Sequence, residues 1–334
     1  MKRKTLIYLF TTLFLLTGIP LSFGWGIWGH KHINKAAVFA LPPEMRTFFY
    51  NHIDFITEES VVPDIRKYTI NDKPEFARHY IDIEDFDMPV DNFPKTMKEA
   101  TAKFDSTLLQ KSGMLPWYIQ VITDKLTKAF KNKNRTEILF LAADLAHYIA
   151  DAYMPLHTSS NHDGQLTNQK GIHSFWESQL PELFGDTYNF YTGDAKFIDN
   201  ITDKTWSIIK HSHQLADTLL LTEKKVHESF SKEKVYNTDA DKKIIKNQYN
   251  QPVHTLEYSK AFHEALNGMV EKQMRASVMD VANFWYTAWV NAGKPDLSTL
   301  DPSDLTSRNS KLLKDELKLW KEGKLFGVES EKEF

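Results

Sequence analysis

The sequence predicts an all-α protein built as a single multi-helix domain, and three observations support this fold class. From Trp25 onward, glycine and proline are sparse, alternating runs of β-branched residues are rare, and apolar residues recur at helical spacing. The chain has 334 residues, 42% of them hydrophobic and 13% aromatic, so it can bury a sizeable core. It contains no cysteine, so this core must stabilise the fold without disulfides.

The first 24 residues have the pattern of a secretory signal peptide. A basic MKRK start is followed by an apolar run, and the small residues Ser22 and Gly24 precede a cleavage site between Gly24 and Trp25. A membrane anchor is the alternative, but the apolar core is short for a span of about 20 residues. We therefore expect a secreted or periplasmic protein whose mature chain begins at Trp25 with a free amine.

The charge balance of the mature chain limits the classes of partner. Cleavage removes Lys2, Arg3 and Lys4 and no acid, so the formal charge changes from −3 to −6. An acidic balance argues against tight non-specific binding to duplex nucleic acid, which depends on many Lys and Arg contacts to phosphate. It leaves open an enzyme in which metal ions meet the phosphate.

Apolar periodicity predicts helices over residues 33–41, 136–154, 204–221 and 258–292. In the last of these, we expect an apolar stripe to pack into the core: Met279, Ala282, Trp285, Ala288 and Trp289. Clusters of Pro, Gly, Asn and Asp predict loops at 41–43, 85–94, 157–171 and 293–302. No linker or internal repeat is evident, so residues 25–300 are predicted to form one domain. Residues 301–334 are predicted to form a charged amphipathic helix with a frayed end.

Histidines and carboxylates gather in four short segments. His147 and Asp151 stand four apart on a predicted helix, which puts both side chains on one face, about 5 to 6 Å apart at Cβ. His173 and Glu177 repeat this spacing, and His157 lies just past the end of the first helix. The other segments contribute His30, Asp64, His79 and Asp82.

One such pair is usually a surface ion pair or a cap, but two pairs close together favour a metal site. Imidazole and carboxylate groups suit zinc, which takes about four nitrogen or oxygen ligands. More candidates are present than one ion can use, which indicates a multinuclear centre; they are His30, Asp64, His79, His147, Asp151, His157, His173 and Glu177.

The order of these residues resembles the superfamily that joins bacterial zinc-dependent phospholipase C and the fungal single-strand-specific zinc nucleases. The matching order is a terminal Trp, then His, Asp and His, then H-x3-D, His and H-x3-E, and it covers residues 25 to about 184. The resemblance implies an all-α fold with three zinc ions at the bottom of a cleft.

By position, the resemblance implies that each zinc has its own ligand set. The first ion would be held by Asp64, His79, His147 and Asp151, and the second by His157, His173 and Glu177. The third would use the amino nitrogen and carbonyl oxygen of Trp25, together with His30, and share Asp151. Gly26 and Gly29 would let the chain end fold back onto this ion. The alternative is that WGIWGH only packs an aromatic strap on the helices, with Trp25 and Trp28 buried.

Three zinc ions around one phosphate suggest metal-assisted hydrolysis of a phosphodiester, in which a zinc-activated water attacks phosphorus in line. Asp64 could also orient or deprotonate this water, which makes it a candidate catalytic residue.

Three features favour a nuclease acting on single-stranded nucleic acid or nucleotides. The W-x4-H spacing at the mature start matches the nuclease branch, and Lys67, three residues after Asp64, resembles the nuclease lysine that faces the phosphate. The segment HYID resembles the one in which an aromatic side chain stacks on a base and an Asp bonds its edge, which assigns these roles to Tyr80 and Asp82. The alternatives are a solvated surface Lys67 and a Tyr80 that only packs.

Other features favour the phospholipase C branch. Glu177 is the phospholipase choice where nucleases carry Asp, and the cysteines of the fungal enzymes are absent. The loop at 159–171 does not align with the base-binding loop of nucleases, so Asn161 and Asn168 are weak candidates for base contact, and His162 is expected to be solvated. One feature counts against the phospholipase C branch: its choline-facing aromatic is Ile65 here, which weakens cation-π recognition of choline.

We therefore favour nucleic acid or nucleotide over phospholipid as the substrate. A phospholipase C acting on phospholipid head groups is the alternative, and a non-catalytic zinc-binding protein is a third hypothesis. No obligatory protein partner is inferred.

Overall fold

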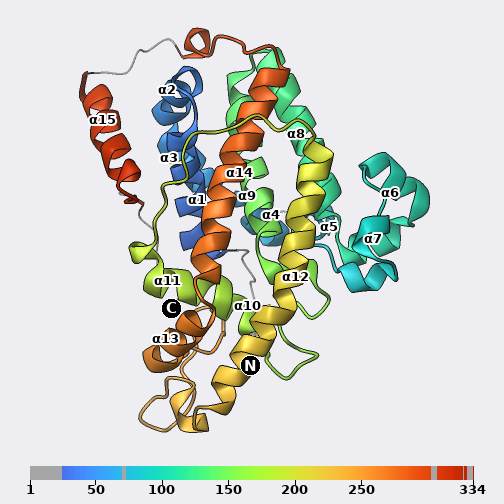
Figure 1. The fold of residues 1–334 in the computed structure, drawn as a ribbon, viewed down its shortest axis with the longest axis vertical. Coiled ribbons are helices and arrows are strands. Elements are labelled where there is room, and N and C mark those ends of the chain that lie inside the picture. The colour runs from blue at the N-terminus through green and yellow to red at the C-terminus, as the bar shows by residue number, and fades with distance from the viewer. Residues whose placement is uncertain (1–24, 70–72, 302–306, 326, 329–333) are drawn as a thin grey trace, which may run out of the picture.

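The computed structural model describes residues 25–69, 73–301, 307–325, 327–328 and 334. The described residues do not include the predicted signal peptide or Gly24, the residue before the predicted cleavage site. Most of the predicted frayed end also lies outside them. The described chain is helical, with isolated β-bridges as the one kind of β structure in these ranges (Figure 1). The predicted all-α fold class is confirmed.

Fifteen α-helices are described. In chain order they are α1 (Gly26–Ala40), α2 (Pro43–Asn51), α3 (Ile53–Glu59), α4 (Val62–Thr69), α5 (Lys73–Ala77), α6 (Met97–Lys103), α7 (Ser106–Ser112), α8 (Leu115–Lys131), α9 (Arg135–Ala152), α10 (Ile172–Ser174), α11 (Leu180–Phe184), α12 (Ile201–Glu228), α13 (Leu256–Ala265), α14 (Met269–Asn291) and α15 (Ser307–Lys321). Shorter turns include a 3-10 helix at Pro155–Thr158 and a π-helix at Phe175–Gln179.

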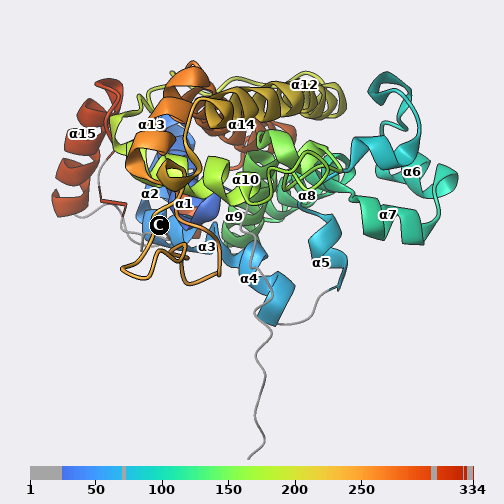
Figure 2. The same cartoon turned by 90° about the horizontal axis from the view of Figure 1, so that it is seen from below.

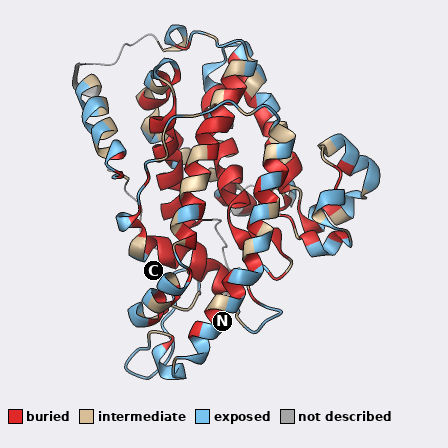
Figure 3. Cartoon of the chain, viewed as in Figure 1, coloured by how far each residue is buried: buried red, intermediate tan, exposed pale blue. Residues whose placement is uncertain are grey.

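Helix α9 lies at the centre of the bundle. It packs against α1, α3, α8 and α14, and α12 covers α8 on the outside. Viewed from below, these helices stand close together, while α6 and α7 project to one side (Figure 2). Burial is concentrated in the central helices (Figure 3). Trp285 of the predicted apolar stripe is fully buried and its indole N–H donates to the carbonyl of Ala142 at 2.9 Å.

Local sequence explains where α9 begins and ends. The side chain of Asn134 accepts the backbone N–H of Glu137, which satisfies one free donor of the first turn. The helix ends at Ala152, shortly before Pro155, because the residue before a proline is disfavoured in the helical region. The chain then turns sharply, so residues on both sides of the turn face the same interior.

The structure corrects three of the predicted helices. The run 258–292 is two helices, α13 and α14, because Asn267 and Gly268 adopt positive φ angles of 50° and 74° between them. This left-handed backbone ends a helix and is typical of Asn and Gly. The helix predicted at 33–41 begins earlier, at Gly26, and the one predicted at 204–221 extends over Ile201–Glu228.

An irregular hairpin, residues 235–255, connects α12 to α13 and was not predicted. Isolated bridges pair Tyr236 with His254 and Lys246 with Pro252, and backbone hydrogen bonds join Asn237 to Val253. The hairpin lies at the same end of the molecule as α10 and α11 (Figure 1).

The predicted charged helix near the C-terminus is α15, at the edge of the bundle (Figure 1). Its Trp320 is buried and donates to the carbonyl of Phe190 at 3.1 Å, while Glu316 accepts the hydroxyl of Tyr50 at 2.9 Å. These contacts attach α15 to the bundle.

None of the helices in the described ranges combines the length and the apolar character that crossing a membrane requires.

Candidate metal centre

Four proposed ligands converge on the buried face of α9. His147 and Asp151 lie one turn apart on this helix, with 3.3 Å between Nε2 of His147 and Oδ2 of Asp151. His79, just after α5, brings its Nδ1 to 2.9 Å from the same oxygen and to 3.0 Å from Nε2 of His147. Asp64 on α4 places Oδ1 3.5 Å from Nδ1 of His79. The four residues implied to hold the first zinc therefore form one buried cluster.

A second group consists of His157, His173 and Glu177. The Nε2 atom of His173 lies 3.1 Å from Nε2 of His157 and 3.0 Å from Oε2 of Glu177. His157 reaches this position because it lies in the 3-10 turn that follows α9, and α12 packs against that turn. Glu177 lies in the π-helix, an uncommon element that is frequent at functional sites.

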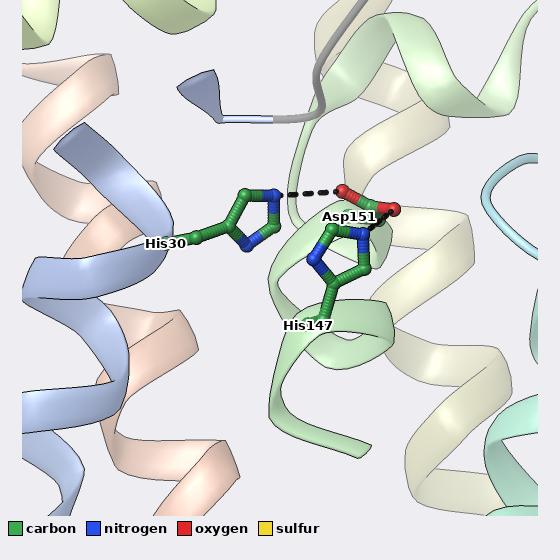
Figure 4. A group of neighbouring side chains, drawn as sticks. All are labelled: His30, His147 and Asp151. Carbon is green, nitrogen blue, oxygen red and sulfur yellow. Dashed lines mark ion pairs between the residues drawn. The ribbon is translucent and has the colours of Figure 1, made fainter. Parts of the chain in front are cut away.

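The first residues of α1 close the remaining side of the site. The Nε2 atom of His30 lies 3.5 Å from Oδ1 of Asp151, and His147 approaches the other oxygen of the same carboxylate (Figure 4). The rings of His30 and His147 stack with centroids 3.9 Å apart. The backbone N–H of Trp25 donates to Oε2 of Glu177 at 3.2 Å. The start of the predicted mature chain thus lies between the two clusters.

The conformation at Trp25 also has a packing role. Trp25 and Gly26 adopt positive φ angles of 49° and 52°, so the chain turns just before α1, whereas Gly29 lies inside the helix. Trp25 and Trp28 are both buried, and the indole of Trp25 donates to the carbonyl of Ala150 at 2.6 Å. The buried tryptophans of the aromatic-strap alternative are therefore present, and the carbonyl of Trp25 accepts the backbone N–H of Gly29 at 3.1 Å.

Three histidine rings are held in one orientation by backbone carbonyls. The Nδ1 atoms of His147, His157 and His173 lie 2.7, 2.8 and 2.9 Å from the carbonyl oxygens of Ser60, His79 and His162 respectively. When each ring donates Nδ1–H to its carbonyl, the lone pair on Nε2 faces the cluster. This arrangement is the usual support for a metal-ligating imidazole.

Buried polar atoms without hydrogen-bond partners indicate that these residues fit zinc. Within the described part of the chain, several buried atoms of the clusters have no hydrogen-bond partner: His30 Nδ1 and Nε2, Asp64 Oδ2, Asp151 Oδ1 and Glu177 Oε1. A buried polar atom without a partner costs free energy, and a bound ion would satisfy those that face it. Within the described residues, three groups have ligand atoms within 4.8 Å of one another: His30, His147 and Asp151; Asp64, His79 and His147; His157, His173 and Glu177.

Burial sets the protonation of the site. It lowers the pKa of His30 to about 4 and that of His157 to about 3, which keeps both rings neutral with a free lone pair. Burial alone would raise the pKa of Asp151, but the neighbouring His147 and His157 hold it well below its usual range. Burial raises the pKa of Glu177 to about 7. Burial alone would lower the pKa of His173, but the carboxylate of Glu177 raises it to about 9. Zinc binds the neutral imidazole and the ionised carboxylate, so its binding at this pair would displace a proton.

Among the residues predicted to meet the substrate, Lys67 lies beside the first cluster. Lys67 is buried rather than solvated, and its Nζ lies 2.7 Å from Oδ1 of Asp64. Asp82 is half-buried, and its Oδ1 has no hydrogen-bond partner among the described residues. Burial, with Asp85 and Glu84 nearby, raises the pKa of Asp82 to about 8.

Tyr80 is half-buried, and its hydroxyl donates to the carbonyl of Lys111 at 2.7 Å. The segment that carries Tyr80 and Asp82 is tied to the second cluster, because the backbone N–H of Ile81 donates to the carbonyl of His157 at 2.8 Å. Gly113, with φ of 89°, packs so closely on Tyr80 that an added Cβ would lie 2.0 Å from its carbonyl oxygen.

The two loop asparagines lie apart from the clusters. Asn168 is exposed, has a positive φ of 64°, and lines a cavity of about 200 Å³ whose lining residues include none of the proposed ligands. Asn161 is buried, and its side chain bonds Thr167 and the backbone N–H of Leu166 within the loop. The structure gives Asn161 a role in shaping the loop.

A cavity of about 750 Å³ opens beside the second cluster. It lies between the loop at 162–171 and the hairpin; its lining residues are His162, Asp163, Lys170, Gly171, His173, Ser174, Tyr236, Ile244, Lys246, Asn250, Gln251 and Pro252. His173 therefore belongs both to the proposed metal site and to the cavity wall. The cavity offers space for a substrate next to the metal centre.

The hairpin wall of this cavity is clamped to the π-helix. Gln179 donates its amide N–H to the carbonyl of His254 at 3.0 Å and accepts the backbone N–H of His254 at 3.2 Å. The rings of His254 and Phe175 stack with centroids 3.6 Å apart. The element that carries Glu177 thus also positions the cavity wall.

Sequence reasoning missed Glu75, a buried carboxylate behind His79. Its Oε1 lies 3.3 Å from Nε2 of His79. The two residues stand four apart, so the same spacing that revealed His147 with Asp151 was available as a signal.

No family model matches the chain, and no curated protein matches it. Among solved structures, the chain is similar to the alpha toxin from Clostridium absonum, with 12% identity and a TM-score of 0.44 over 81% of this chain and 65% of the toxin. It is also similar to the alpha toxin of Clostridium perfringens from the avian strain SWCP, with 13% identity and a TM-score of 0.43 over 86% of this chain and 66% of the toxin. The chain spans less than two thirds of the length of either toxin.

Proposed function

We propose that this chain is an exported zinc-dependent phosphodiester hydrolase. One observation carries the proposal. The described residues include three groups of buried His, Asp and Glu side chains, and within each group the ligand atoms lie within 4.8 Å of one another. His147 belongs to two of the groups. A structural metal site needs one closed set of about four ligands, whereas adjoining sets are typical of hydrolases that act on phosphate esters.

Zinc bound in these groups would act as a Lewis acid toward a phosphoryl oxygen and lower the pKa of a bound water toward 7. Asp64 and Lys67 would supply further contributions to catalysis. Asp64 has one oxygen fixed by Lys67 and the other without a hydrogen-bond partner among the described residues, so Oδ2 can orient a water or take its proton. Lys67, buried beside this carboxylate, would place its positive charge toward the phosphate.

We propose single-stranded nucleic acid or nucleotides as the substrate class. The resemblance assigns the base edge to Asp82, which is half-buried and directly follows Ile81, the residue whose backbone N–H donates to the carbonyl of His157. Lys170 and Lys246 both line the cavity beside His173, where they could pair with a second phosphate of the strand.

Phospholipase C activity is the second candidate, and one feature of the same cavity favours it. Tyr236, Ile244 and Pro252 give the hairpin wall an apolar surface, and Ile244 is 47% exposed at its rim. An apolar rim next to lysines also suits the surface of an anionic lipid bilayer.

Parallel assays test the proposal. The zinc-loaded chain beginning at Trp25 would be incubated with single-stranded DNA, RNA, a 3′-nucleotide, phosphatidylcholine vesicles and bis(p-nitrophenyl) phosphate. We expect turnover of the nucleic acids and of the small diester. Turnover of vesicles without nucleic acids would establish the phospholipase candidate, and zinc binding without any turnover would establish a non-catalytic zinc protein.

Two lysine variants sharpen the test of the substrate class. Lys170→Gln with Lys246→Gln should weaken turnover of oligonucleotides and flatten its salt dependence, while bis(p-nitrophenyl) phosphate is hydrolysed as before. Lys242→Gln with Lys243→Gln is the matched control, because these lysines lie on the same hairpin but do not line the cavity.

A further inference from the structure

The carboxylate of Glu75 lies in a closed pocket behind His79. Glu75 is 1% exposed, and its Oε1 lies 3.3 Å from Nε2 of His79. The hydroxyl of Tyr148 donates to the same Oε1, and Arg78 donates to Oε2 at 2.7 Å. Arg66 adds a charge 3.6 Å from Oε2. Glu75 is thus fixed in place from three sides and directed at the ring of His79.

His79 directs the other ring nitrogen into its cluster than His147, His157 and His173 do. His147, His157 and His173 direct Nε2 into their clusters and Nδ1 toward a backbone carbonyl. His79 directs Nδ1 into the cluster, 2.9 Å from Oδ2 of Asp151, and Nε2 toward Glu75. It is the one of these four rings whose outer partner is a side chain.

We infer that Glu75 is a positioning residue that selects the tautomer of His79. By accepting a hydrogen bond from Nε2–H, Glu75 keeps the proton on Nε2 and the lone pair of the neutral ring on Nδ1, where it faces Asp64, His147 and Asp151. The inference rests on the proposed function, because it assumes that this cluster holds zinc. It adds a residue outside the nine proposed ligands on which metal affinity depends.

The contacts of Glu75 distinguish orientation of His79 from simple membership of a stabilising ion network. A purely structural ion network would include Asp144 equally, because Asp144 accepts a hydrogen bond from Arg66 at 2.8 Å. Among the described residues, Asp144 forms no hydrogen bond or ion pair with a proposed ligand, whereas Glu75 forms one with His79. Asp144→Asn is therefore a matched control for substitutions of Glu75.

The first measurement uses the unsubstituted protein. Nitrogen-15 NMR of the histidine rings distinguishes protonation at Nδ1 from protonation at Nε2. We expect His79 to carry its proton on Nε2, and His147, His157 and His173 to carry theirs on Nδ1, in the zinc-loaded mature chain. A His79 ring protonated at Nδ1 would overturn the inference without any variant.

The second measurement compares zinc affinity by competition with a chelator. Removing a residue that orients a metal ligand typically weakens affinity 10 to 100-fold, so we expect a loss of about this size at one site in Glu75→Ala. Glu75→Gln should lose less, because its amide oxygen can still accept from Nε2–H, and Asp144→Asn should bind zinc as the parent does. Circular dichroism identifies which variants are folded.

The outcomes separate this inference from the proposed function. A parent that binds no zinc overturns both. A parent that binds zinc and hydrolyses diesters, with a folded Glu75→Ala or Glu75→Gln of unchanged affinity, overturns only the role of Glu75. Equal losses in Asp144→Asn and Glu75→Ala would likewise reduce Glu75 to a member of the ion network.

Discussion

The backbone nitrogen of Trp25 lies 3.2 Å from Oε2 of Glu177, although 152 positions separate the two residues. In the predicted mature protein this nitrogen is a free amine, which has a lone pair that an amide lacks. Altering the chain end at Trp25 therefore tests whether its amine is a zinc ligand.

One added residue should disrupt this end of the site. A mature chain with Gly before Trp25 should lose about one zinc per chain and most of its phosphodiesterase activity, because the added amide nitrogen cannot coordinate. Elemental analysis and turnover of bis(p-nitrophenyl) phosphate would measure both. Trp25→Phe is the control, since it keeps the amine and an aromatic ring against Trp176 but removes the indole N–H that donates to Ala150. Full zinc content in the extended chain would establish that Trp25 serves only to pack.

Asp151 should be the ligand least tolerant of substitution. Its Oδ2 lies 2.9 Å from Nδ1 of His79 and its Oδ1 lies 3.5 Å from Nε2 of His30, so a single carboxylate faces two groups of ligands. We expect Asp151→Asn to lose about two zinc ions and His157→Ala about one, as measured by elemental analysis. Asp280→Asn, which removes a buried carboxylate outside the clusters, should retain all of them. Equal losses in the two ligand variants would contradict a shared Asp151.

Removing zinc should destabilise the folded protein. The proposed centre buries Asp64, Asp151 and Glu177 side by side, and a bound cation offsets their mutual repulsion. A ligand that binds only the native state at 100 times its Kd adds about 2.7 kcal/mol to the free energy of unfolding. We expect the melting temperature to fall on strong chelation and to recover with about three zinc ions per chain. A melting temperature that chelation leaves unchanged would argue against these buried sites.

The ring of Tyr80 should matter for nucleic acids and not for small diesters. Stacking of a base on an aromatic side chain contributes about 1 to 3 kcal/mol, so Tyr80→Ala should reduce kcat/KM for oligonucleotides roughly 5 to 150-fold. Bis(p-nitrophenyl) phosphate should be hydrolysed at the parent rate. Tyr80→Phe keeps the ring and removes the hydroxyl contact to Lys111, so it should behave as the parent does. An equal loss on both substrates would mean that Tyr80 only packs.

Much of the centre could be predicted because its information is local. His147 with Asp151, and His173 with Glu177, each stand four residues apart, and helical geometry alone brings such side chains together. The break between α13 and α14 also has a local signal, because the Asn267 and Gly268 pair favours a turn. One helix was nevertheless predicted over 258–292.

Other parts that escaped prediction depend on contacts between distant segments. The spacing of Glu75 from His79 is a local signal, but Tyr148, which holds Glu75, lies 73 positions away, and nothing near Glu75 in the sequence indicates that partner. The hairpin has few apolar residues and no regular alternation, and it owes its position to the contact of His254 with Gln179, 75 positions away. Local pattern cannot indicate such pairings, because they exist only once the bundle has formed.

The π-helix at Phe175–Gln179 makes two properties of this protein inseparable. A single π turn amounts to an α-helix with one residue inserted, so deleting one residue here would rotate the following chain by about 100° and shorten it by about 1.5 Å. Glu177 and Gln179 cannot both keep their present directions after such a change. A shortened variant would therefore lose its second cluster and the anchor of its hairpin together.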